Sequence, residues 1–381
     1  MRKVALPWLM RRPGRTLALW PFLVIVATLA GACSPLGIGA TRSPSPSAVA
    51  SASRFPSPAP SAGASPAPAT APLGVLVSPF SGTNYTVSLV GIDGRVIASA
   101  QTTTPARVTC ANGSAGVVPM PVSTSNTRAY FMDAQGVVRY LASNGDAGRA
   151  TTLPIGPTRR SSFAVSPDDQ RIAVVVIDVT PDGAATKLYV EDLNGGGHHL
   201  DTFNDSGAYT LWATGWHGTS NLVVAKVPAC AQGGGPGCCG PLEYHVVDPA
   251  TAIRRFTIGG PQCVIAGPPS PAGVVCEIKP FEVANVLDWT GKQTGGFPIG
   301  GPTFAALSPD GHLVAVVTGM TTAIFRTDII LNLAACGWID DSHVIAGGDA
   351  QTQARLADVT TGKIIPVAAQ GDCAGRIPGG L

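Results

Sequence analysis

Short apolar runs alternate with polar turns along residues 73–381. In residues 164–175, two apolar segments flank the turn Ser-Pro-Asp-Asp, and the arrangement returns at residues 306–317 around Ser-Pro-Asp-Gly. Proline presets φ at the second position of such a turn, and Asp, Asn or Gly tolerates the bend that follows. Each copy therefore predicts two strands joined by a tight turn.

Weaker copies of this unit fill the rest of the chain. Gly-Trp opens copies at residues 215–225 and 337–347, and a Ser-Pro turn opens another at 270–276. The strands that follow the turns start near Ala129, Ile172, Leu222, Val274, Val314 and Val344. A period of roughly 40–45 residues with four short strands is typical of a β-propeller, and residues 73–381 hold about seven such units.

A second set of polar turns runs in phase with the first and is expected after the middle strands of the blades. Asp-Gly and related pairs in these turns supply the positive φ that hairpins need. The turns lie at residues 93–94, 133–136, 192–195, 248–251, 288–291 and 358–362. Two independent turn signals in one period predict an all-β chain forming a single propeller of about seven four-stranded blades.

The turns at residues 166–175 and 308–317 resemble the TolB-like propeller repeats, which are relatives of the WD-repeat proteins. The hallmark of that family is a Ser-Pro-Asp-Gly turn followed by a small apolar strand. The resemblance implies the propeller fold over residues 73–381. It implies no single activity, because members range from binding scaffolds to domains attached to hydrolases.

Blade one shows only three strands, at residues 74–77, 85–92 and 95–100. A propeller ring must be closed, because an open edge strand invites aggregation. We therefore expect residues 372–378 to add the missing strand. The first strand of blade two is expected at 116–122, and blade six has no obvious fourth strand.

The first 33 residues predict an export signal. A basic segment precedes the apolar residues 16–32, and Leu-Ala-Gly-Ala before Cys33 resembles a bacterial lipobox, although its leucine lies one position further from the cysteine than usual. We expect residues 1–33 to be a signal peptide and Cys33 to be lipidated. The alternative is that the apolar segment stays as an uncleaved membrane anchor.

Residues 34–72 predict a disordered linker. Pro, Ser and Ala make up 25 of the 30 residues from 43 to 72. Such a tract has no apolar surface to bury and cannot offset its ordering entropy. It would hold the propeller clear of the membrane, which places the protein outside the cytoplasm, on the cell surface or in the periplasm.

The charge distribution limits the classes of partner that we expect. Residues 1–72 hold seven basic side chains and no acidic one, so the remainder has 18 basic and 23 acidic side chains, a net charge of −5. A domain without a basic field does not attract phosphate backbones, and we expect no nucleic-acid partner. We expect a monomer whose partner is an unknown protein or cell-wall ligand.

Eight cysteines remain besides Cys33, and an even number in an exported chain predicts disulfides. They are Cys110, Cys230, Cys238, Cys239, Cys263, Cys276, Cys336 and Cys373. Cys263 and Cys276 lie on neighbouring strands of one blade and are the favoured pair. Cys336 and Cys373 both fall where the ring closes, with Cys110 as the other candidate partner of Cys373.

Cys230 is expected to pair with Cys238 or Cys239 and so to staple an insertion at residues 230–240. Metal binding by these three cysteines is the alternative. Their glycine-rich spacing matches no zinc knuckle, and no histidine stands beside them. Disulfide pairing is therefore the favoured interpretation.

Other polar clusters are better explained as turns. His198 and His199 adjoin on a predicted strand and point to opposite faces, so one strand cannot present both to a metal with Asp201. Aspartates in the Ser-Pro turns are expected to cap those turns. The histidines of the inter-strand turns, namely His217, His312 and His343, could gather on one face of a channel.

Trp216 and Trp338 occupy equivalent positions, which predicts packing between blades. No Gly-x-Ser-x-Gly elbow, phosphate loop or His-Glu-x-x-His sequence is present. We assign no catalytic, cofactor-binding or metal-binding residue. The favoured function is a membrane-tethered binding or scaffold module. The alternative is an extracytoplasmic propeller enzyme, lactonase-like or quinoprotein-like, with carboxylates and histidines converging in the central channel.

Overall fold

The computed structural model describes most of the chain from residue 71 onward. The described ranges are residues 71–78, 82–110, 113–180, 183–196, 202–204, 207–231 and 240–381. The predicted signal segment at 1–33 and residues 34–70 of the predicted linker lie outside them. Within the described ranges, no helix is long and apolar enough to cross a membrane.

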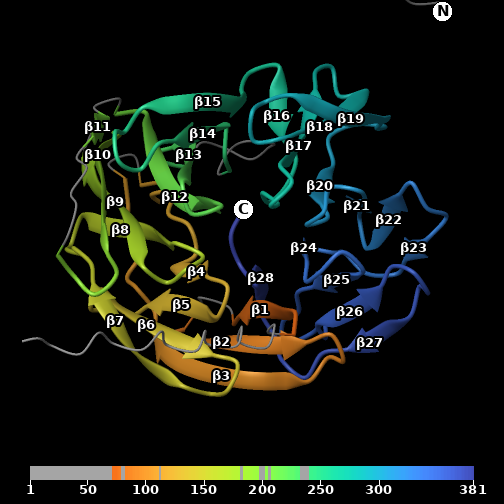
Figure 1. The fold of residues 1–381 in the computed structure, drawn as a ribbon, viewed down its shortest axis with the longest axis horizontal. Coiled ribbons are helices and arrows are strands. Elements are labelled where there is room, and N and C mark those ends of the chain that lie inside the picture. The colour runs from red at the N-terminus through yellow and green to blue at the C-terminus, as the bar shows by residue number, and fades with distance from the viewer. Residues whose placement is uncertain are drawn as a thin grey trace, which may run out of the picture. The chain divides into compact units, whose positions relative to one another are not determined.

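The described strands form seven four-stranded antiparallel sheets arranged in a ring (Figure 1). This confirms the prediction of an all-β, seven-bladed propeller.

From the innermost strand outward, blade 1 holds β28 (Asp372–Ile377), β1 (Leu73–Val77), β2 (Asn84–Gly91) and β3 (Val96–Thr103). Blade 2 holds β4 (Val122–Thr124), β5 (Arg128–Met132), β6 (Val137–Ala142) and β7 (Ala147–Thr152). Blade 3 holds β8 (Arg159–Val165), β9 (Arg171–Thr180), β10 (Gly183–Asp192) and β11 (Thr202–Asn204).

The other four blades follow in chain order. Blade 4 holds β12 (Tyr209–His217), β13 (Asn221–Pro228), β14 (Glu243–Val247) and β15 (Arg254–Gly259). Blade 5 holds β16 (Cys263–Ile265), β17 (Val274–Ile278), β18 (Val283–Leu287) and β19 (Gln293–Pro298). Blade 6 holds β20 (Phe304–Leu307), β21 (Val314–Thr318), β22 (Thr321–Phe325) and β23 (Ile330–Leu331). Blade 7 holds β24 (Gly337–Trp338), β25 (His343–Ala346), β26 (Arg355–Asp358) and β27 (Ile364–Pro366).

The ring is closed by the strand that the sequence predicted. β28 pairs antiparallel with β1, from Leu73 opposite Ile377 to Val77 opposite Asp372. All five residues of β1 are buried, because β1 has a strand on either side and a blade on either face. Strands buried on both faces read as continuous apolar runs, whereas the outer strand β3 alternates exposed and half-buried residues.

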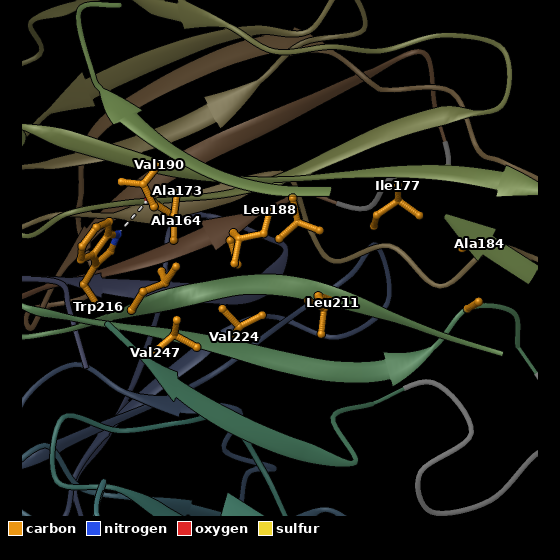
Figure 2. Packing of buried hydrophobic residues seen from close by; sticks show 14 residues of the cluster. Ala164, Ala173, Ile177, Ala184, Leu188, Val190, Leu211, Trp216, Val224 and Val247 are labelled. Atoms are coloured by element: carbon orange, nitrogen blue, oxygen red, sulfur yellow. Dashed lines mark hydrogen bonds between the residues drawn. The ribbon is translucent and has the colours of Figure 1, made fainter. Parts of the chain in front are cut away.

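The blades pack on one another through large side chains set against small ones. Figure 2 shows the cluster between blades 3 and 4, where the fully buried Trp216 lies against Ala164 and its Nε1–H donates to the Ala164 carbonyl oxygen at 3.0 Å. Trp338 makes the same hydrogen bond to Ala306 at 2.9 Å. Packing between blades is therefore confirmed as the role of both tryptophans.

The Ser-Pro-Asp turns hold themselves together through their first side chain. Ser166 Oγ accepts the backbone N–H of Arg171 at 2.9 Å and donates to Asp168 at 2.5 Å. Ser308 makes both contacts at the same offsets, at 2.9 and 2.6 Å. The repeated sequence thus encodes a repeated hydrogen-bond pattern, which explains why it was the clearest signal.

Two details of the expected strand map are wrong. The first strand of blade 2 is β4 rather than residues 116–122, because Pro119 and Pro121 cannot donate to a sheet ladder. Blade 6 does have a fourth strand, but β23 is only two residues long.

Candidate functional site

A central cavity of about 500 Å³ is lined by residues from all seven blades. Most of the lining is apolar, including Phe163, Leu307 and Trp338. Gly380 and Leu381 also line it, and the chain end lies at the centre of the ring in Figure 1. The cavity is therefore the central channel of the propeller, narrowed by the residues that follow β28.

Arg376 is the one charged side chain among the described residues that line this channel. It is half-buried on β28, opposite Gly74 of β1, and it makes no hydrogen bond or ion pair within the described part of the chain. Burial lowers the pKa of its guanidinium, while the carboxylates of Asp341 and Asp340 oppose this shift. Because arginine stays protonated in proteins, the channel contains a fixed positive charge with five N–H donors.

Residues 378–381 run along one rim of the channel. The Gly379 N–H donates to the Ser125 carbonyl oxygen at 2.7 Å, and the Leu381 N–H donates to that of Trp216 at 2.6 Å. His217 Nδ1 lies 2.7 Å from the Leu381 carbonyl oxygen, to which it donates. This segment therefore fastens blade 1 to the turn after β4 in blade 2 and to the end of β12 in blade 4.

The aspartates of the inner turns tie neighbouring blades together. Asp169 accepts hydrogen bonds from Thr127 Oγ1 at 2.6 Å and from the Tyr130 hydroxyl at 2.9 Å. Asp341 accepts the Asp310 N–H at 2.8 Å, which joins blade 7 to blade 6. Capping of their own turns, which the sequence predicted for all of these aspartates, is seen for Asp168, Asp310 and Asp340, which accept the N–H groups of Gln170, His312 and Ser342. Asp169 and Asp341 instead join one blade to the next.

The three histidines of the inner turns are not brought together. His217 contacts the chain end, His312 lies on the turn of blade 6, and His343 Nδ1 is 2.8 Å from Asp340. Within the residues that the structure describes, no three His, Cys, Asp or Glu side chains are grouped so that they could hold a metal ion. His198, His199 and Asp201 lie outside those residues.

A polar cluster that the sequence pattern did not predict lies in blade 4. Glu243 accepts hydrogen bonds from Lys226 Nζ at 3.1 Å and His245 Nε2 at 3.0 Å. Burial alone would raise the pKa of Glu243, but the two donors hold it below its usual value. Glu243 and His245 alternate along β14, and Lys226 lies opposite Glu243 on β13, so only the strand register could have revealed the cluster.

Three disulfides join cysteines of the described ranges. Cys263 is joined to Cys276 within blade 5, which is the pair that the sequence favoured. Cys336 is joined to Cys373, so that a covalent bond links blade 7 to the closing strand β28. Disulfides of this number are typical of proteins outside the reducing cytoplasm.

The third disulfide corrects the expected pairing of the insertion. Cys230 is joined to Cys110, 120 residues away, and not to Cys238 or Cys239, which lie outside the described residues. The segment after Cys110 crosses to blade 4, where Gly116 bridges Cys230 and the Val117 N–H donates to the Ala229 carbonyl oxygen at 3.0 Å. The bridge therefore fastens a long connection between blades.

No protein-family model and no curated protein matches the chain. Among solved structures it is similar to KlHsv2 with loop 6CD replaced by a Gly-Ser linker, at 12% identity over 80% of this chain and 98% of that one, with a TM-score of 0.42. It is also similar to BamB from Moraxella catarrhalis, at 13% identity over 79% and 86% of the two chains, with a TM-score of 0.34.

A third similar structure is prolyl oligopeptidase B from Galerina marginata, at 12% identity and a TM-score of 0.36. The likeness covers 77% of this chain but only 41% of the oligopeptidase. Likeness at this level carries no information about ligand or activity.

Proposed function

We propose that this protein is a membrane-tethered, extracytoplasmic propeller that binds an anionic group of a protein or cell-wall ligand in its central channel. The observation that carries the proposal is Arg376, the single charged side chain among the described channel residues, which has no ion-pair partner there. The protein would act as a monomer, held to the membrane through Cys33 or the apolar segment before it.

The guanidinium of Arg376 can receive an incoming anion, which must compete with the carboxylates of Asp341 and Asp340. A half-buried guanidinium lacks part of its hydration, and a carboxylate or phosphate would replace it with charge-assisted, bidentate hydrogen bonds. The apolar walls formed by Phe163, Leu307 and Trp338 keep the local dielectric low, which strengthens such an ion pair. A volume of about 500 Å³ is within the range of ligand pockets and suits a small anion or the end of a peptide.

The tether and the compartment are supported by separate observations. Three disulfides are consistent with an oxidising compartment, and the apolar residues 16–32 before Cys33 have the length of an export signal. The Pro/Ser/Ala-rich residues 34–72 would provide reach between the membrane and the ring.

The enzyme alternative finds less support in the channel. General acid–base chemistry needs a group that exchanges a proton near neutral pH, and arginine does not. Asp340 accepts hydrogen bonds from the Ser342 N–H and from His343 Nδ1, and Asp341 accepts the Asp310 N–H, but none of Asp340, Asp341 and His343 lines the channel. The described lining is therefore suited to binding an anion and offers no acid–base pair for a hydrolase.

Anion binding can be tested with a hexaglutamate peptide, using a hexalysine peptide as the charge-reversed control. We expect the full-length protein to bind hexaglutamate and not hexalysine in isothermal titration calorimetry. Arg376→Gln should weaken binding at least about tenfold, because a charge-assisted hydrogen bond is lost. Arg95→Gln is the matched control, since that side chain is 84% exposed on blade 1. Equal binding of hexaglutamate by both variants would contradict the proposal.

A further inference from the structure

A second and larger cavity, of about 1150 Å³, lies between blades 5 and 6. No residue lines both this cavity and the central channel. One wall comes from β16, β17 and β19, the other comes from β20, β21 and β22, and residues 300–303 connect the two. Small residues in the lining, among them Ala266, Gly319 and Ala323, leave this space unfilled.

Glu277 is the buried charged group of this cavity. It lies on β17, and only 2% of its surface is exposed. One carboxylate oxygen accepts the Thr303 N–H at 2.5 Å, and the other has no hydrogen-bond donor among the described residues. Burial raises the pKa of this carboxyl, and the Thr303 N–H opposes the shift. Buried carboxylates are normally paired, so one side of Glu277 is available to a donor.

The other charged side chains of the cavity leave Glu277 unpaired. Arg326 and Asp328 lie on the turn between β22 and β23 and also line the cavity. Arg326 Nη1 donates to the His312 carbonyl oxygen at 3.0 Å, away from Glu277. Neither side chain forms an ion pair or hydrogen bond with the carboxylate within the described ranges.

Aromatic side chains provide an apolar surface around this carboxylate. The rings of Phe297 and Phe325 lie 4.6 Å apart between their centroids, and both residues line the cavity. Phe304, which also lines it, is 37% exposed. Met320 follows the lining residue Gly319 and is 64% exposed. An apolar body could therefore pack on these side chains while a polar group reaches Glu277.

We propose that the cavity between blades 5 and 6 is a ligand site for an apolar amine, whose ammonium group pairs with Glu277 and whose hydrophobic body packs on the phenylalanines. The volume slightly exceeds the usual range of ligand pockets, which are mostly apolar with a few placed polar groups. An ammonium group has three N–H donors, and one of them can donate to the unpaired oxygen of Glu277. This site is independent of anion binding at Arg376.

Glu277 also fastens residues 300–303 through Thr303, and this structural role must be separated from ligand binding. Glutamine has the same shape and retains an oxygen that can accept the Thr303 N–H. Glu277→Gln therefore keeps the structural contact but removes the negative charge. Glu282→Gln, at an exposed position on the turn after β17, is the matched control.

The test uses phenethylamine and 2-phenylethanol, which share the apolar body and differ in the charged group. Saturation-transfer NMR titrations of the full-length protein should show phenethylamine binding at least about tenfold more tightly than the alcohol. Glu277→Gln should abolish that difference, and Glu282→Gln should keep it. Phe304→Ala should weaken both probes, because it removes part of the apolar wall.

The pH dependence provides a second measurement. Phenethylamine stays protonated between about pH 4 and pH 8, as a lysine side chain does. A change in its affinity over this range therefore reflects a change in the protonation of the protein. Affinity should fall on acidification as Glu277 becomes protonated, and Glu277→Gln should remove this dependence, although Arg326 and Asp328 remain. Equal binding of the two probes, no binding of either, or an unchanged Glu277→Gln variant would overturn the proposal.

Discussion

Removal of the closing strand should destabilise the whole ring and not merely fray one end. A chain that ends after Ala369 lacks β28, which is the innermost strand of blade 1 and the only contact in that sheet between the two ends of the propeller sequence. It also lacks Cys373 and therefore the covalent link to Cys336 in blade 7. Both losses open the ring at the same place.

The magnitude follows from the contacts that are lost. The Cys336–Cys373 bridge spans 37 residues, and the loop-entropy model gives such a cross-link about 4 kcal/mol. The fully buried side chain of Ile377 contributes about 2 to 3 kcal/mol through the hydrophobic effect. The whole free energy of unfolding of a domain is about 5 to 15 kcal/mol, so loss of β28 should remove a large part of it.

The assay is thermal unfolding followed by near-UV and far-UV circular dichroism. At about 2 °C per kcal/mol for a domain of this size, truncation after Ala369 should lower Tm by at least about 12 °C. Replacing both Cys336 and Cys373 by serine should lower Tm by about 8 °C, because β28 then remains paired with β1. This double variant isolates one bridge, whereas a reductant would also open Cys110–Cys230 and Cys263–Cys276.

An unchanged Tm after truncation would contradict this expectation. It would mean that β28 does not close the ring in solution, and that another strand, residues 75–78 paired into blade 7, does so. A loss equal to that of the double cysteine variant would assign all of the effect to the disulfide. Only a larger loss supports a contribution from the strand itself.

Three further predictions concern the tether, the domain and the acid response. Cys33→Ala should release the protein from the membrane fraction or leave it as an unprocessed precursor; unchanged mass and retention would favour an uncleaved anchor. A chain beginning near Leu73 should fold as a soluble all-β monomer, and far-UV circular dichroism with substantial helix would contradict this. Hydrogen bonds from Thr360 and its neighbour lower the pKa of Asp358 from 3.8 to about 2. Because the folded-state pKa is the lower one, the stabilisation by Asp358 is present above about pH 4 and lost as the pH falls toward 2. Asp358→Asn should therefore be less stable than the wild type at neutral pH, with the difference shrinking over this window in urea unfolding.

The fold could be predicted because short, repeated sequence motifs determine its turns. Ser166 and Ser308 each organise a turn through hydrogen bonds within six residues, so the sequence alone contains the signal. Ring closure followed from counting strands in blade 1. The first strand of blade 2 was misplaced because Gly116 lies in an extended segment that pairs with blade 4, a contact that the local sequence does not show. Pro119 and Pro121 in the same stretch do argue locally against a ladder strand there.

The candidate sites could not be predicted, because each depends on residues that are distant in sequence. Arg376 is one arginine among many in the sequence, and only the ring places it in a channel lined by all seven blades. Glu277 lies in an apolar strand, and its burial depends on the next blade and on the connection through Thr303. Cys110 and Cys230 are likewise joined by the path of a long connection and not by a spacing.

Strand β28 both closes the ring and holds Arg376. Ring closure and anion binding must therefore be tested with separate variants. Arg376 lies three residues after Cys373, so truncation after Ala369 removes the guanidinium together with the closing contacts. Loss of hexaglutamate binding in the truncated chain would therefore not distinguish an open ring from a missing charge. Arg376→Gln keeps the backbone pairing of β28 and the disulfide, and the double cysteine variant keeps the arginine. If the channel binds anions through Arg376, the first variant should lose binding at nearly unchanged Tm. The second should bind hexaglutamate below its own lowered Tm, since β28 remains paired.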